Sequence, residues 1–590
     1  MRLINANTLR FEEFFEKPLP PYLILSHTWG EDEVTFRDMQ QPHLHLGKSG
    51  YAKITQTCRL ARSKAIDYVW IDTCCIDKTS SAELTESINS MFQWYQRAVV
   101  CVVHLADMES GVDFGTGVQF SRWITRGWTL QELIAPKRVE FYDSKWKLCG
   151  QKPRDSDVLS AATKIPEDLL LGNHRSSEYS VAQRLSWASS RTTTRVEDEA
   201  YCLFGILEVN MPLIYGEGKM AFRRLQEELI KRSNDITIFA WQPTREEVQE
   251  GHCGVLAASP QAFALCEHVC VWRPSTSHNP QFVLTNRGIQ LQDIFFHRMP
   301  LKSDQPAGAN ESLKREYVFM VGFLSRGSGA YLGIQLRKIG ESLFLRKSRP
   351  LKMISGTENK SLLKTDIATC HFVTDTRPLD NDTLLAFRKR CTEVSIPEWS
   401  MKHTIPSGYW DDQDMIQFHL PTYLVGAFLL EGDVGGKRTR FTVLYRREGE
   451  DQVRIYILET AKHTAATAYI FRRRAPGDML HWEDLGLDHP QVLEASNQTQ
   501  VVIDRRQFTV TASLPSKALD FFGRTKIGRS LQLEVVENRP KGDQGAKGRE
   551  LVPYGQGRTN RRHRSTDESF PRIANTSLPR SRPGFQSIPL

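Results

Sequence analysis

Four short apolar runs alternate with helical patterns in the first 150 residues. They are apolar on both faces, as in buried strands of a helix-covered sheet, and they span residues 22–26, 68–72, 99–105 and 138–142. After the first run, an apolar stripe recurs at helical spacing and comprises Ile54, Cys58, Ala61 and Ala65. The pattern predicts an α/β domain over residues 1–150, with a flavodoxin-like parallel sheet and flanking helices.

A second helix is predicted between the second and third strands. Ser80 and Glu83 have the spacing of a capping box, and the pattern ends near Ala98. One face of this helix is apolar and contains Leu84, Ile88, Met91, Phe92 and Tyr95. A helical crossover of this kind joins neighbouring parallel strands.

Polar loops follow the predicted strands. These loops are residues 26–32, 72–77, a segment from 107 onward, and 121–134. In parallel sheets, ligands bind outside the carboxyl ends of the strands. We therefore expect the four loops to converge on one crevice.

The fourth loop contains two tryptophans, two arginines and one carboxylate, Glu132. If a helix begins at Thr129, Trp128 and Glu132 lie on the same face, because they are four residues apart. An aromatic ring beside a carboxylate suits a flat, cationic or sugar-bearing ligand. The same pair also suits a buried tryptophan beside a hydrogen-bonded glutamate.

Residues 157–241 show helical patterns, which predicts a helical extension over residues 151–245. One apolar stripe comprises Val196, Ala200, Leu203, Phe204 and Leu207, and a later one contains Leu225 and Leu229. The sequence Tyr215-Gly-Glu-Gly-Lys lacks the spacing of a phosphate-binding loop and indicates a turn that starts a helix.

From about residue 250 the apolar period becomes two, which predicts a β-rich domain over residues 250–537, built as a sandwich or partial barrel. A hairpin is expected around Asn286, and further strands at 317–324, 331–336, 441–445 and 453–458. Glycine- and lysine-rich connections are expected near 354–364 and 432–440. No ligand for this domain is evident from its sequence.

Charge and cysteine usage narrow the function classes. Of the formal net charge of +8, residues 538–590 contribute +7, with eleven Lys or Arg against four Asp or Glu. This basic, proline-rich segment predicts a disordered tail, with a nuclear or nucleic-acid role as its alternative. The eleven cysteines include no C-x-x-C pair, and no metal site is predicted. Without a leader or membrane helix in the sequence, we expect a cytoplasmic protein.

Three ordered blocks resemble the fungal heterokaryon incompatibility (HET) domain family. They are Leu25-Ser-His-Thr-Trp-Gly, Trp70-Ile-Asp-Thr-Cys-Cys-Ile-Asp and Arg126-Gly-Trp-Thr-Leu-Gln-Glu. The resemblance covers roughly residues 20–140 and extends to the helical segments around Arg195 and Tyr215. It implies non-self recognition after fusion of unlike fungal cells, a form of fungal innate immunity, and programmed cell death.

The family is in turn similar to TIR domains, whose NAD-cleaving members have a tryptophan four residues before the catalytic glutamate. Trp128 and Glu132 match that spacing, so the resemblance implies NAD as substrate and Glu132 as the catalytic carboxylate. The implied pocket residues are Ser26, His27, Trp29, Gly30, Asp32, Asp72, Asp77, Arg126 and Trp128. No cofactor is implied.

Several residue roles and the activity itself have alternatives. His27 is either a general base or a structural donor, and Asp72 either lines the pocket or caps the following loop. Cys74 and Cys75 fit packed small side chains better than nucleophiles. The main alternative function is a non-enzymatic adaptor that acts by self-association of its HET domain, with the β-rich domain as sensor and an unknown protein partner.

Overall fold

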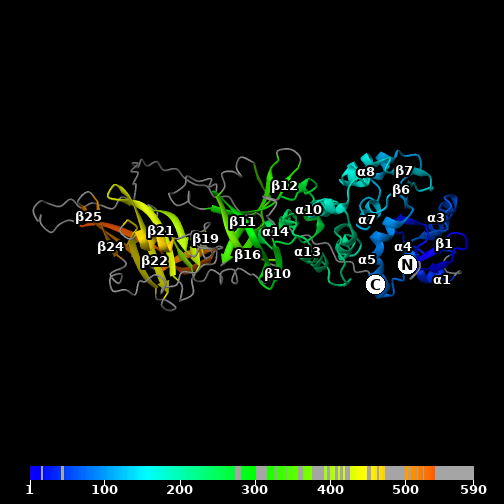
Figure 1. Cartoon of the computed structure of the whole chain (residues 1–590). Helices are drawn as coiled ribbons and strands as arrows, with labels where there is room; N and C mark the ends of the chain where they lie inside the picture. The colour runs from blue at the N-terminus through cyan, green and yellow to red at the C-terminus, as the bar shows by residue number, and fades with distance from the viewer. Residues whose placement is uncertain are drawn as a thin grey trace, which may run out of the picture. The chain divides into compact units, whose positions relative to one another are not determined.

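The structure of this chain is a computed structural model (Figure 1). It describes residues 1–14, 18–41, 46–272, 281–300, 315–325, 329–340, 342–355, 363–374, 391–394, 399–405, 410–411, 416–418, 425–447, 453–461, 464–471, 498–503, 506–513, 516–521 and 524–538. The predicted tail, 538–590, lies outside these residues apart from Asn538.

The N-terminal region contains a seven-stranded sheet with the order β2-β1-β4-β3-β5-β6-β7. The strands are β1 (Arg2–Asn5), β2 (Phe11–Glu13), β3 (Tyr22–His27), β4 (Tyr68–Trp70), β5 (Val100–His104), β6 (Val139–Tyr142) and β7 (Leu148–Lys152). Strands β4, β3, β5 and β6 are parallel. All four predicted strands are therefore confirmed, and they form the 2-1-3-4 order of flavodoxin-type sheets.

Helices connect the parallel strands, as the sequence pattern predicts. Helix α3 (Tyr51–Ser63) follows β3, and α5 (Ser81–Arg97) follows β4. The connection from β3 to β4 and the connection from β4 to β5 run in opposite directions along the sheet, because β3 lies between β4 and β5. If both connections are right-handed, as is usual, α3 and α5 cover opposite faces of the sheet. Ser80 caps α5 through Glu83 N, and the helix stops before Ala98, both as predicted.

The sheet departs from the prediction at its edges. β1, β2 and β7 pair antiparallel with their neighbours, and the patterns did not predict them because these strands are short and mostly half-buried. Ala65 was assigned to the α3 stripe, but it lies beyond the helix in a left-handed conformation with φ +55° and is exposed. Ile66 is buried in its place.

The segment after β7 is a series of short helices rather than one continuous helical pattern. Val196 was placed on an apolar stripe, but it is 47% exposed. The predicted turn at Tyr215 is confirmed, and its glycine amides at 216 and 218 both donate to the Glu197 carboxylate, at 2.8 and 3.1 Å. These amides are therefore already occupied by a carboxylate of the chain itself. The other helices within the described residues are α1 (Phe36–Gln40), α4 (Asp72–Cys75), α6 (Phe114–Val118), α7 (Thr129–Ile134), α8 (Ser156–Thr163), α9 (Glu167–Leu170), η1 (Ser176–Glu178), α10 (Val181–Ser186), α11 (Asp198–Tyr201), α12 (Phe204–Leu207), α13 (Met220–Arg232), η2 (Ile236–Phe239), α14 (Arg245–Glu250), η3 (Pro260–Phe263) and α17 (Thr464–Ile470).

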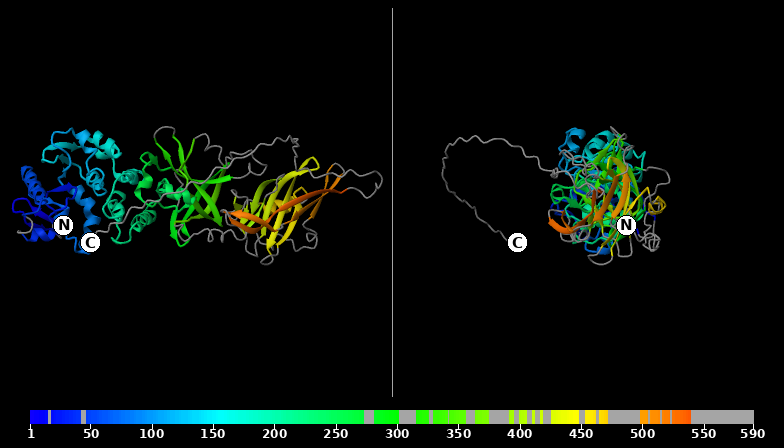
Figure 2. Two further views of the ribbon diagram at one scale, coloured as in Figure 1. Left: turned by 180° about the vertical axis from the view of Figure 1, so that it is seen from behind. Right: turned by 90° about the vertical axis from the view of Figure 1, so that its left-hand side faces the viewer.

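The later region is rich in β-strands, as predicted (Figure 2). A hairpin joins β10 to β11 with Thr285 opposite Gly288, and every further strand named above is present. The connection expected near 432–440 is instead a tight turn at Gly435 and Gly436 between two long strands. The expected connection near 354–364 lies mostly outside the described residues.

The described strands of the later region are β8 (His252–Cys253), β9 (Val269–Cys270), β10 (Gln281–Thr285), β11 (Gly288–Pro300), β12 (Arg315–Leu324), β13 (Tyr331–Gly340), β14 (Leu343–Lys347), β15 (Lys352–Ile354), β16 (Leu363–Phe372), β17 (Cys391–Glu393), β18 (Trp399–Ile405), β19 (Trp410–Asp411), β20 (Ile416–Phe418), β21 (Val425–Val434), β22 (Lys437–Arg447), β23 (Val453–Glu459), β24 (Gln498–Ile503), β25 (Arg506–Ser513), β26 (Ser516–Phe521), β27 (Arg524–Ser530) and β28 (Gln532–Asn538).

These strands form four sheets, of nine, five, four and three strands. One apolar core runs from the N-terminal sheet through the helical segment into the nine-stranded sheet and includes Leu3, Trp187 and Phe372. A separate core lies between residues 394 and 531. The described residues up to Asn538 belong to one compact unit. Among the described helices, none has the length and hydropathy to cross a membrane.

Candidate functional site

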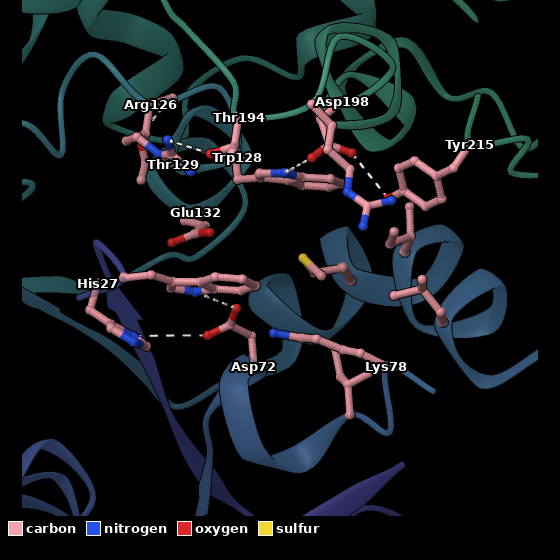
Figure 3. Close-up of a pocket in the computed structure, with 16 residues that line it drawn as sticks. His27, Asp72, Lys78, Arg126, Trp128, Thr129, Glu132, Thr194, Asp198 and Tyr215 are labelled. Atoms are coloured by element: carbon pink, nitrogen blue, oxygen red, sulfur yellow. Dashed lines mark hydrogen bonds and ion pairs between the residues drawn. The ribbon is translucent and has the colours of Figure 1, made fainter. Parts of the chain in front are cut away.

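A cavity of about 290 Å³ lies beyond the carboxyl ends of β3 and β4 (Figure 3). Its wall comes from the loop after β3, from α4 and α5, from the loop and helix 126–132, and from the helical segment. The lining residues are His27, Trp29, Asp72, Ile76, Lys78, Leu84, Ile88, Met91, Arg126, Trp128, Thr129, Glu132, Thr194, Arg195, Asp198 and Tyr215.

Glu132 lies on α7, with its side chain 8% exposed at the cavity wall. Ser26 Oγ, at the end of β3, donates a short hydrogen bond to its carboxylate, and Trp123 Nε1 donates to Ser26 Oγ at 2.7 Å. The pKa of Glu132 is raised to about 8. Burial is the main cause and the nearby Asp72 carboxylate adds to it, whereas the hydrogen bond from Ser26 acts in the opposite direction. Within the described residues, no salt bridge joins Glu132 to a cation. The carboxyl group of Glu132 therefore titrates near neutral pH.

The loop before Glu132 is fixed from two sides. Gly127 packs so closely against the helical segment that a Cβ there would lie 2.5 Å from Thr193 Cγ2. Thr129 Oγ1 donates to the Trp123 carbonyl at 2.6 Å, and the buried Arg191 donates to Thr129 Oγ1 at 2.8 Å. The helical segment, residues 151–245, thus positions the residues that precede Glu132.

One side of the cavity is formed by residues that follow β3 and β4. Trp29 Nε1 donates to Asp72 Oδ2 at 2.9 Å, and the Lys78 ammonium lies 3.5 Å from the centre of the Trp29 ring. His27 Nδ1 lies 3.9 Å from Asp72 Oδ1, as the dashed line in Figure 3 marks, and its Nε2 lies 3.7 Å from Glu33. Figure 3 shows Asp72 and Lys78 on this side, with Glu132 between them and Trp128.

The other side comes from the loop before α7 and from the helical segment. Trp128 Nε1 and Tyr215 Oη donate to the two carboxylate oxygens of Asp198, at 3.3 and 3.1 Å. Burial raises the pKa of Asp198. The Arg195 guanidinium stacks on Tyr215 at 4.4 Å, and Arg126 donates to Thr194.

The structure brings together most of the site residues expected from the sequence. His27, Trp29, Asp72, Arg126, Trp128 and Glu132 line the cavity, and Ser26 lies behind Glu132. Three others lie elsewhere: Gly30 N donates to Glu33, Asp32 accepts from Ser49 N, and Asp77 accepts from Thr79 in the turn before α5. The segment from 107 onward was also expected at the crevice, but it contributes no lining residue.

Five polar lining residues lie outside the four loops that were expected to form the crevice. These are Lys78, Thr194, Arg195, Asp198 and Tyr215. Four of them come from the helical segment, whose resemblance to the region that follows HET domains was the one available signal. Cys74 and Cys75 are buried as expected, and burial raises the pKa of the Cys74 thiol well above its usual range. A thiol held protonated in this way is a poor nucleophile.

Comparisons with known proteins agree with the resemblance of the N-terminal blocks. Residues 22–117 match the family model "Heterokaryon incompatibility protein (HET)", and residues 220–292 match a domain of unknown function (DUF8212). No solved structure matches the chain.

A curated relative, the vegetative incompatibility protein HET-E-1 of Podospora anserina, is 44% identical over 223 residues. The match covers 36% of this chain but 16% of that protein, so the chain spans about a sixth of the relative's length. The matched family model and this relative agree with each other, and the three signature blocks lie around one cavity. The N-terminal part of the chain, over residues 22–117, is therefore similar to the heterokaryon incompatibility (HET) domain family.

Proposed function

We propose that this chain acts in heterokaryon incompatibility, where its HET domain triggers programmed cell death by hydrolysing NAD at Glu132. The observation that supports this most directly is the buried carboxyl of Glu132, which lines a cavity without a cationic partner among the described residues. A strongly perturbed acid in a cleft is typical of catalytic sites. The 2-1-3-4 order of the parallel strands supports kinship with TIR domains.

The size and lining of the cavity support a ligand such as one half of a dinucleotide. Its volume of about 290 Å³ is at the lower limit of ligand pockets, which hold roughly 300 Å³ or more. The nicotinamide ring is a flat cation, and Trp29 and Trp128 offer aromatic surface to it. Arg126 and Arg195 form no salt bridge with a described carboxylate, so they are available to phosphate oxygens.

In the proposed reaction the bond between the ribose carbon and the nicotinamide nitrogen breaks, and its electron pair stays with the nitrogen. Neutral nicotinamide leaves, and the ribose becomes oxocarbenium-like. The ionised Glu132 stabilises this cation, as a carboxylate does in glycoside hydrolysis. Water then adds to the carbon and releases a proton, which gives ADP-ribose. Because the bound nicotinamide is positively charged, it favours the ionised form of Glu132.

The test is NAD turnover by the purified full-length chain and its Glu132→Gln variant. Loss of the charge should lower turnover by about 100-fold or more, as loss of a preorganised charge-stabilising group does. Glu140→Gln is the control, because Glu140 is also buried, at 4% exposure in β6 of the N-terminal sheet, but does not line the cavity. Thermal melting shows whether both variants are folded.

Equal turnover by the wild type and Glu132→Gln would falsify the proposal. If the wild type releases no nicotinamide even at concentrations that permit self-association, the adaptor alternative replaces hydrolysis. In a fungal host, conditional expression should kill cells with the wild-type chain and spare them with Glu132→Gln. Death caused equally by both chains would separate the cell-death role from the chemistry.

A further inference from the structure

Lys78 is a cation inside the proposed site that the reaction described above does not use. It follows α4 and lines the cavity, with its ammonium 3.5 Å from the centre of the Trp29 ring. In Figure 3 its nitrogen points toward Asp72 and the interior of the cavity. No salt bridge or hydrogen bond joins this ammonium to another described side chain. Its main contact is therefore the aromatic face.

The Trp29 ring is itself held in place. Its Nε1 donates to Asp72 Oδ2 at 2.9 Å, so the ring and the carboxylate form one rigid pair. A tryptophan face next to a carboxylate attracts organic cations, and this attraction is strongest where water is displaced. Lys78 as a residue is exposed, but burial of its ammonium among the surrounding protein atoms lowers the pKa of Lys78.

We infer that Trp29 and Asp72 form a binding site for a flat organic cation, and that Lys78 fills this site in the unliganded chain and is displaced when the cation binds. The inference deepens the proposed function, since NAD has such a ring, and it rests on that function only for the identity of the complete ligand. Lys78 then competes with the flat organic cation for the same site. This competition weakens binding of the cation and raises the ligand concentration needed to fill the site.

The chemistry of the pair explains why an internal lysine suits this role. An ammonium on a flexible stem stabilises the empty aromatic face, yet no carboxylate among the described residues lies within hydrogen-bonding distance to hold it there. A larger flat cation gains stacking area that an ammonium lacks. Displacement therefore exchanges one cation for another, and the Trp29–Asp72 hydrogen bond is kept throughout.

The test is calorimetric titration of the full chain with 1-methylnicotinamide, a flat cation without ribose or phosphate. Lys78→Met should bind it about tenfold more tightly than the wild type, because the competitor is gone. Arg195→Met is the matched control, since it removes one positive charge from the same cavity but not from the Trp29 face. Trp29→Leu should abolish binding in either background.

Equal gains in Lys78→Met and Arg195→Met would show general electrostatic repulsion and overturn the inference, as would unchanged affinity in Lys78→Met. Lys78→Gln, whose side chain is polar, uncharged and one heavy atom shorter, should give the same gain if Lys78→Met fails to fold. The probe has no bond for the proposed hydrolysis. Tighter binding by a chain that does not cleave NAD would therefore leave this inference standing and remove only the proposed reaction.

Discussion

Two buried glutamates in this chain have opposite surroundings. Glu132 is 8% exposed at the cavity wall, and Glu316, at the start of β12, is 4% exposed. Glu316 forms salt bridges with Lys347 at 3.0 Å and Lys352 at 3.1 Å, whereas Glu132 accepts a hydrogen bond from a serine. Although burial alone raises the pKa of both, the two lysines hold the pKa of Glu316 below its usual value, and that of Glu132 rises to about 8.

The ionised carboxylate of Glu316 therefore stabilises the fold, whereas the ionised carboxylate of Glu132 destabilises it. A buried ion pair keeps its charges because each compensates the other, and removing one partner leaves the other uncompensated. A buried carboxyl without a cation is stable as the neutral acid and becomes costly when ionised. Such a cost is expected where the charge is needed for ligand binding or chemistry.

The largest expected effect concerns Glu316. Replacing it with Gln leaves the ammonium groups of Lys347 and Lys352 without their carboxylate, so the free energy of unfolding should fall by about 3 to 5 kcal/mol. Denaturant unfolding at pH 7 measures this loss, and 1-methylnicotinamide binding measured below the unfolding transition should not change. A loss under 1 kcal/mol would mean that this pair stabilises the fold no more than a surface pair does.

Glu132 should show the reverse behaviour, with a smaller effect that depends on pH. Its pKa is about 8 in the folded chain and near 4.3 when unfolded, so the folded state binds the additional proton between these values. Stability from this group is therefore fully present at low pH and is lost as pH rises toward 8. Relative to the wild type, Glu132→Gln should be equally stable at pH 4.5 and more stable at pH 9, by a few kcal/mol at most.

Urea unfolding of the two chains across this pH range is the measurement. The comparison between the glutamates would fail if Glu132→Gln were less stable than the wild type at pH 9. That result would mean that the ionised carboxylate is compensated in the fold, for example by the buried Arg191, whose charge lowers the pKa of Glu132.

The sequence allowed Glu132 to be identified because its signals are local. The helix spacing from Trp128 and the position after a buried strand both lie within a short stretch, and α7 and β5 are present where the pattern predicted them. Its neighbours Asp198 and Tyr215 could not be found in this way, since they reach the cavity only through the packing of the helical segment on the sheet.

The ion pairs of Glu316 could not be predicted from sequence patterns either. Glu316, Lys347 and Lys352 belong to three different strands, and strand pairing in the nine-stranded sheet brings them together. Neither their spacing in the chain nor the period-two pattern indicates an ion pair. The pattern could predict that β12 is a strand, but the partner of a buried charge depends on the order of strands in the sheet.

The smallest expected effect concerns Ser26, which donates to the Glu132 carboxylate and thereby lowers its pKa. Ser26→Ala removes a hydrogen bond to a charged group, so the pKa of Glu132 should rise by about one further unit. Because kcat/KM reports ionisation of the free enzyme, NAD cleavage by the wild type should increase as pH rises through about 8. The variant should reach the same plateau at higher pH. A profile that keeps its midpoint in Ser26→Ala but loses height would instead assign Ser26 to positioning of Glu132, and it would contradict a pKa-lowering effect of the Ser26 hydrogen bond.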